Sequence, residues 1–210
     1  MAATNLLKIA NLAFERNDAL LFEPVSFELN SGEALHIEGA NGVGKTTLFQ
    51  LLIKILEPCA GQLYFRGKLI NQCQFDYLSD ILFIGHQAGV KSALTVAENL
   101  KWMSPDNTSA ENIASALHAV DLQRYANIPC YRLSAGQHRR VALARLITTK
   151  ASLWFLDEPF AALDKQGVGF IQGCMQSHLD QGGAIIFSSH QDLANIEAPS
   201  YRLTPFREVA

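Results

Sequence analysis

The sequence lacks the long apolar segments that would anchor a chain in a membrane. None of its 210 residues lies in a run approaching the roughly 18 consecutive apolar residues of a membrane span. Residues 1–8 also lack a charged start followed by a long apolar core, so we expect no signal peptide. Any action on a membrane would therefore need separate membrane-spanning partners.

Positive charge and cysteine are also too sparse for a nucleic-acid-binding or disulfide-stabilised protein. The net charge is −3 and the pair Arg139-Arg140 is too short for a basic patch, so we expect no nucleic-acid partner. The four cysteines have no CxxC spacing, which indicates reduced thiols of a cytosolic protein. They are Cys59, Cys73, Cys130 and Cys174. With 49% hydrophobic residues and no internal repeat, residues 1–210 are predicted to form one domain.

A phosphate-binding loop is the clearest motif. The stretch GANGVGKT, residues 39–46, matches the pattern GxxxxGK followed by Ser or Thr. Its glycines let backbone amides turn toward phosphates, Lys45 adds a mobile positive charge, and the Thr46 hydroxyl suits Mg²⁺. A buried strand predicted at 34–38 and a helix predicted at 46–56 give the loop its expected context, with the positive helix end at the phosphates. The nucleotide-binding residues predicted for the loop are Gly39, Ala40, Asn41, Gly42, Val43, Gly44, Lys45, Thr46 and Thr47.

Two carboxylates follow a second predicted strand. Residues 153–156, LWFL, are apolar on both faces, which favours an interior strand of a parallel sheet. Asp157 and Glu158 then fall at its carboxyl edge, where such sheets bind ligands. We expect Asp157 to hold Mg²⁺ and Glu158 to polarise the water that attacks the γ-phosphate.

A histidine follows a third buried strand, predicted at 184–187. A neutral imidazole at that position can contact the γ-phosphate and hold Glu158 and the water in line, so His190 is predicted to act in catalysis. The other five histidines show no metal-ligand spacing.

The stretch LSAGQ, residues 133–137, begins a further helix, with Ser134 at its cap. With the motifs above, it makes the chain resemble the nucleotide-binding subunits of ABC transporters over nearly all of its length. Ala135 replaces the usual glycine of their LSGGQ signature. The resemblance implies that Ser134, Ala135, Gly136 and Gln137 contact ATP held by a second copy of the chain.

The same resemblance assigns further residues. Gln87 corresponds to the glutamine that reaches Mg²⁺ and the attacking water, although His86 replaces the commoner proline before it. Asp164, in the triplet of residues 162–164, corresponds to the D-loop at the dimer interface. An aromatic residue usually stacks on adenine; family spacing points near Arg16, whereas Phe14 is the nearest aromatic, and either could stack.

The fold implied is α/β: a P-loop NTPase of the ABC ATPase type, with a RecA-like core, an N-terminal antiparallel β layer and a helical subdomain. The core is expected at 1–91 and 131–210 and the helical subdomain at about 92–130. Strands are predicted at 6–14, 25–29, 62–65, 81–84 and 201–203, and helices at 95–103, 110–120 and 165–181, the last ended by Gly182-Gly183.

Within the superfamily the chain looks most like the ATP-binding subunits of cytochrome c maturation systems, which export heme. The stretches behind this are residues 82–91, 133–146 and 153–160. The resemblance implies Mg²⁺ and ATP, integral-membrane subunits as partners, a second copy of the chain, and a peripheral location on the cytoplasmic face of a bacterial inner membrane. Two alternatives stay open: an ABC ATPase for another cargo, and a soluble ABC-type assembly switch.

Overall fold

The computed structural model describes residues 5–161, 163–190 and 196–206. Residue 162, in the predicted D-loop triplet, and residues 1–4, at the start of the segment tested for a signal peptide, lie outside the described residues. The chain forms two compact units. The first comprises residues 1–83, 151–157 and 177–210, and the second comprises residues 84–150 and 158–176.

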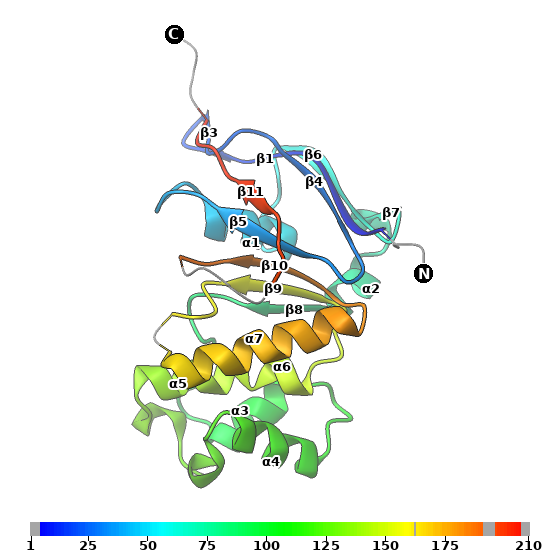
Figure 1. Cartoon of the computed structure of the whole chain (residues 1–210). Helices are drawn as coiled ribbons and strands as arrows, with labels where there is room; N and C mark the ends of the chain where they lie inside the picture. Colours follow the sequence, from blue (N-terminus) through cyan, green and yellow to red (C-terminus); the bar gives the residue numbers. More distant parts are fainter. Residues whose placement is uncertain (1–4, 162, 191–195, 207–210) are drawn as a thin grey trace. The chain divides into compact units, whose positions relative to one another are not determined.

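Two sheets and a helix make up the first unit. The antiparallel sheet has the order β4-β1-β6-β7, and the second sheet has the order β11-β5-β10-β9-β8. In the second sheet β5, β9, β10 and β11 pair in parallel. Figure 1 shows the two sheets on either side of α1. The strands are β1 (Asn5–Ala13), β4 (Val25–Asn30), β5 (Ala34–Glu38), β6 (Ala60–Phe65), β7 (Lys68–Leu69), β8 (Ile81–Ile84), β9 (Leu153–Asp157), β10 (Ala184–Ser188) and β11 (Ser200–Arg202).

The sequence predicts β5 and β8 with the bounds observed and the other strands it names to within two residues. All residues of β9 and β10 are buried, which confirms that these apolar runs are interior strands. Shorter elements complete this unit: the hairpin β2 (Glu15–Arg16) and β3 (Ala19–Leu20), a 3-10 turn (Ile70–Gln72) and α2 (Gln74–Ser79).

Helix α1 (Lys45–Leu52) packs against both sheets of this unit through its buried side chains. Phe49 has no exposed surface and meets Phe155 of β9 edge-on, with ring centroids 6.5 Å apart. The predicted helical end at residue 56 is wrong, because the chain leaves the helix at Ile53. Lys54 adopts a left-handed φ of 59° and the Ile55 amide donates to the Gln50 carbonyl at 2.8 Å. This is a Schellman ending made without the usual glycine.

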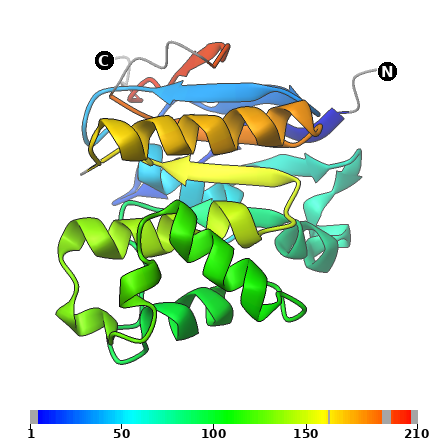
Figure 2. The same ribbon diagram turned by 60° about the horizontal axis from the view of Figure 1, so that its bottom comes forward.

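The second unit contains helices packed around an apolar core of their own. Figure 2 brings these helices forward, coloured green to yellow-green. They are α3 (Val96–Met103), α4 (Ala110–Ala119), α5 (Ala135–Leu143) and α6 (Arg145–Thr148), with two 3-10 turns (Gln123–Tyr125 and Cys130–Arg132). Val96, Leu100, Leu117 and Val141 lie in the centre of this core and are at most 1% exposed. Thr95 caps α3 with a capping box, in agreement with a helix predicted from residue 95.

Helix α7 (Lys165–Asp180) links the second unit to the first along the chain. Gly182, with a φ of 84°, donates its amide to the Leu179 carbonyl, and the Gly183 amide donates to the His178 carbonyl. The prediction that glycines end this helix is therefore confirmed. All four cysteines are free thiols, and burial raises the pKa of Cys174 to about 11. Across the part of the chain that the structure describes, no helix is long and apolar enough to span a membrane.

Candidate functional site

The phosphate-binding loop connects β5 to α1, as its sequence pattern predicts. Gly44 is the N-cap of α1, with a φ of 112°, and a Cβ added there would lie 2.9 Å from the side chains of Leu21 and Phe22. Glycine is required at this point by both backbone and space. No side chain caps the helix start, so its first amides face the loop as an anion-binding group.

Lys45 curls over this loop. Its Nζ donates to the carbonyl oxygens of Gly39 at 2.7 Å and Ala40 at 3.4 Å. A long side chain held by two carbonyl oxygens can turn toward a triphosphate, whose negative oxygens are stronger acceptors. The position of Lys45 is therefore compatible with the phosphate-binding role predicted for it.

Thr46 and Asp157 are hydrogen-bonded within the first unit, although 111 positions separate them in sequence. The Thr46 Oγ1 donates to Asp157 Oδ2 at 2.8 Å. Asp157 is 2% exposed, and its Oδ1 accepts from Ser188 Oγ, also at 2.8 Å. The parallel register of β9 and β10 sets Ser188 beside Asp157, so the sheet itself aims this carboxylate. Sequence reasoning missed Ser188; its place at the end of a buried strand was the available signal.

The two candidates for stacking on adenine, Phe14 and Arg16, differ in burial and in their contacts. Phe14 is half-buried and packs against the core of the first unit. Arg16 is exposed, and its Nη2 donates to Thr47 Oγ1 at 3.4 Å, on the first turn of α1. His190 follows β10 in the first unit and is exposed. Its predicted contact with the γ-phosphate stays a prediction, as does the choice between Phe14 and Arg16.

Glu158 and Gln87 belong to the second unit. Glu158 has a left-handed φ of 52°, uncommon for a residue with a side chain. Its carbonyl accepts from the Ala161 amide at 3.2 Å and from Arg139 Nη2 at 2.7 Å. Gln87 is exposed in the loop after β8.

Ser134 caps α5, as the sequence predicts. The Gln137 amide donates to Ser134 Oγ at 3.3 Å, and the Ser134 amide donates to Gln137 Oε1 at 2.9 Å. This reciprocal pair forms a capping box and fixes the helix start. The Ser134 hydroxyl accepts in this arrangement and keeps its own hydrogen for donation to a ligand.

The signature residues line a hollow of about 390 Å³. Ser134, Gly136 and Gln137 share it with Asp164, so the structure brings the predicted signature and D-loop residues together. A hollow of this size falls in the range of small-molecule sites, roughly 300–1,000 Å³. Ala135 is exposed on the same helix start.

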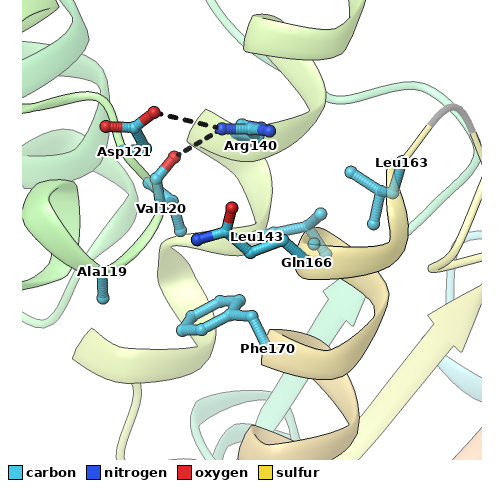
Figure 3. Close-up of a pocket in the computed structure, with 9 residues that line it drawn as sticks. Ala119, Val120, Asp121, Arg140, Leu143, Leu163, Gln166 and Phe170 are labelled. Atoms are coloured by element: carbon cyan, nitrogen blue, oxygen red, sulfur yellow. Dashed lines mark hydrogen bonds and ion pairs between the residues drawn. The ribbon is translucent and has the colours of Figure 1, made fainter.

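Arg140, on α5, forms an ion pair with the D-loop residue Asp164 beside this hollow. Its Nη2 donates to Asp164 Oδ2 at 2.9 Å, and its Nη1 lies 3.8 Å from Asp121 Oδ2. Figure 3 shows Arg140 reaching both Asp121 and the Val120 carbonyl above an apolar cavity that Phe170 also lines. That cavity measures only about 30 Å³, too little for a nucleotide.

A phosphate-binding loop, the hydrogen-bonded pair Thr46 and Asp157 and a capped signature helix are the features expected of an ATP-hydrolysing cassette. Comparison with known families agrees: the model of the ABC transporter family matches residues 22–161. The chain belongs to the ABC transporter family and is an ATPase of the type that forms its ATP-binding subunits.

Comparison with individual proteins points to a narrower group within this family. The chain is similar to the cytochrome c biogenesis ATP-binding export protein CcmA of Pseudomonas putida KT2440, with 47% identity over 189 residues, 89% of this chain and 90% of that protein. It is 43% identical to the protein of the same name from Escherichia coli K12, over 95% of this chain and 96% of the relative. The solved structure of cbiO1 from Clostridium perfringens, part of the ABC transporter complex cbiONQ, has a TM-score of 0.76 at 25% identity and covers 96% of this chain and 85% of that one.

Proposed function

We propose that this protein is the ATP-hydrolysing subunit of a membrane complex that drives an export step of cytochrome c biogenesis, with heme as the cargo. The observation that carries the proposal is the 47% identity, over 89% of the chain, to a relative named for that process. The signature lies in residues 133–146 and the carboxylate pair lies in residues 153–160. Both stretches are among those by which the sequence resembles subunits of cytochrome c maturation systems.

In the proposed mechanism, the amides of residues 39–44 and Lys45 bind the triphosphate of ATP. The residues present fit a magnesium ion, because Thr46 Oγ1 and Asp157 Oδ2 are hard oxygen atoms 2.8 Å apart. The described residues contain no cluster of three or more His, Cys, Asp or Glu side chains that could hold a metal by themselves. In this proposal Thr46, Asp157 and Gln87 would hold Mg²⁺ together with the phosphates, and the ion would neutralise charge on the phosphate oxygens.

Hydrolysis requires a water molecule held in line with the γ-phosphate. Glu158 polarises that water, and His190 holds the water and Glu158 in line through its imidazole. Gln87 contacts the same water from its loop. Positioning and charge stabilisation supply nearly all of the catalysis in phosphoryl transfer, so each of these side chains acts through its placement.

The second half of each site comes from another copy of the chain. The hydroxyl of Ser134 and the amide of Gly136 contact the γ-phosphate of ATP bound to the partner, with Asp164 at the interface. ATP then closes the pair and hydrolysis reopens it, and the membrane subunits convert this movement into transport. Opposed sites of this kind require twofold symmetry or a close copy of it.

A tagged Glu158→Gln protein tests this proposal in its native host. Membranes are solubilised gently with ATP present, and the co-purifying proteins are identified. We expect recovery of heme-handling membrane subunits, and less of them with Glu197→Gln, a matched change of an exposed carboxylate outside every motif. Recovery of an unrelated permease would overturn the heme assignment and keep the ATPase; recovery of no membrane protein would overturn the transport role in favour of a soluble switch.

A further inference from the structure

Arg139 is a charged side chain buried inside the second unit. It lies on α5, five residues after the cap Ser134, and is only 5% exposed. Nη1 donates to the Gly85 carbonyl at 2.5 Å, and Nη2 donates to the Glu158 carbonyl at 2.7 Å. One guanidinium therefore joins α5 to two other segments of its unit, and each of those segments carries a predicted catalytic side chain.

Removing the charge of a guanidinium from water is costly, and the hydrogen bonds to the Gly85 and Glu158 carbonyls offset part of that cost. Hydrogen bonds from a charged donor are shorter and about twice as strong as neutral ones. The two nitrogen atoms of Arg139 lie in one rigid plane, so together they fix the spacing between the Gly85 and Glu158 carbonyls. A lysine at this position would be a single point donor and could not impose that spacing.

The Glu158 backbone has a specific need for such support. Its φ of 52° lies in the left-handed region, where a residue with a side chain is strained. Strained residues persist only when their surroundings hold them in place. The Ala161 amide and Arg139 both donate to the Glu158 carbonyl, which fixes the peptide from which the Glu158 side chain projects.

The loop that carries Gln87 is held at both ends. At its start, Gly85 is bound by Arg139. At its end, the buried Asn99 accepts from the Lys91 amide at 2.8 Å and donates to the Lys91 carbonyl at 2.9 Å. Gln87 lies exposed between these two anchors.

We propose that Arg139 is a positioning residue for ATP hydrolysis, which sets the Glu158 peptide and the Gln87 loop at a fixed spacing on α5. The proposal rests on the catalytic roles proposed above for Glu158 and Gln87. Arg139 itself contacts neither nucleotide nor water in this scheme. It couples the start of the signature helix to the groups that orient the attacking water.

The test compares Arg139→Met and Arg139→Lys with the wild type, using the full chain. ATP binding is measured first, and the steady-state kcat for ATP hydrolysis is then measured per nucleotide-binding site. A displacement of about 1 Å at a catalytic group costs about 100-fold in rate, so Arg139→Met should lower kcat about 10- to 100-fold while ATP affinity changes less than threefold. Arg139→Lys keeps the charge and can reach one carbonyl, so its kcat should lie between the two. Arg124→Gln, at an exposed position of a 3-10 turn, serves as the matched loss of an arginine and should match the wild type.

A double mutant separates positioning from a merely structural role. In a Gln87→Ala background, Arg139→Met should cost less than in the wild type, because part of its effect passes through the Gln87 loop. Full additivity, or a lower melting temperature with an unchanged kcat per binding site, would overturn the positioning role. Glu158→Gln is measured in parallel: if it keeps wild-type turnover, the proposed catalytic site itself is wrong, whatever Arg139 does.

Discussion

Replacing Thr46 with valine tests whether its hydroxyl is a metal ligand in addition to a hydrogen-bond donor. Valine has nearly the same shape and removes only the hydroxyl that donates to Asp157 Oδ2 at 2.8 Å. A hydrogen bond to a charged group contributes about 1.5–3 kcal/mol to stability. The carboxylate that loses this donor, Asp157, is 2% exposed, so we expect a cost within this range, about 1.5–3 kcal/mol.

The effect on nucleotide binding is separate and is read as ligand-induced stabilisation. At a concentration of 100 times Kd, a ligand stabilises its protein by about 2.7 kcal/mol, and for a chain of this size each kcal/mol raises Tm by about 2–4 °C. Wild-type protein should therefore gain about 5–11 °C with Mg-ATP. Loss of a metal ligand that weakens Mg-ATP about tenfold would halve this gain for Thr46→Val.

The assay is a thermal unfolding series with no nucleotide, with ATP and EDTA, and with Mg-ATP. Thr148→Val is the matched control, since the Thr148 hydroxyl is also engaged, accepting from Ser104 Oγ at 2.7 Å, and the residue is 7% exposed. It should lower Tm and keep the full magnesium-dependent gain. An undiminished magnesium-dependent gain in Thr46→Val would refute the assignment of Thr46 as a ligand.

Two further predictions concern stability. Gly61→Ala should destabilise the antiparallel sheet by about 2–5 kcal/mol, because the added Cβ would lie 2.3 Å from the Asn11 carbonyl oxygen and Gly61 has a φ of 91°. Gly67 has a φ of 76°, and its Cβ would have no atom within 4 Å. Gly67→Ala should therefore cost only about 1–2 kcal/mol, and urea titrations measure both variants. Tyr77 is buried and its hydroxyl donates to the Leu52 carbonyl at 2.6 Å, and burial raises its pKa above the ordinary 10.0. As pH rises above 10, the unfolded chain loses this proton before the folded chain does, so the free energy of unfolding falls. Tyr77→Phe should be less stable at pH 7 by about 1 kcal/mol, because it lacks the hydrogen bond to Leu52. Its stability should also fall less steeply at high pH, because it has no phenol to titrate.

Local patterns allowed much of the fold and the phosphate loop to be predicted. The glycine pattern marks the turn into α1, serine marks the start of α5, and Gly182-Gly183 mark the end of α7. The end of α1 escaped prediction because Lys54 takes the left-handed position that usually needs glycine. Apolar spacing alone continues to residue 56 and gives no sign of that turn.

The contacts that orient the predicted side chains could not be read from the sequence. Ser188 reaches Asp157 because β10 pairs with β9 in a given register, across 31 positions of sequence. Arg139 reaches Gly85 across 54 positions, by the length and direction of one side chain. Strand register and side-chain reach depend on tertiary packing, and neither leaves a local pattern.

An ATP site shared between two chains requires the protein to dimerise when it binds ATP, and the association state of Glu158→Gln reports this. The mass of the purified protein is measured by light scattering with saturating Mg-ATP, with ADP and with no nucleotide. We expect twice the mass of one chain with Mg-ATP, the mass of one chain with ADP or without nucleotide, and loss of the dimer when Ser134→Arg blocks the signature hollow. If Glu158→Gln binds Mg-ATP and stays a monomer, the ATP site is not shared between two chains.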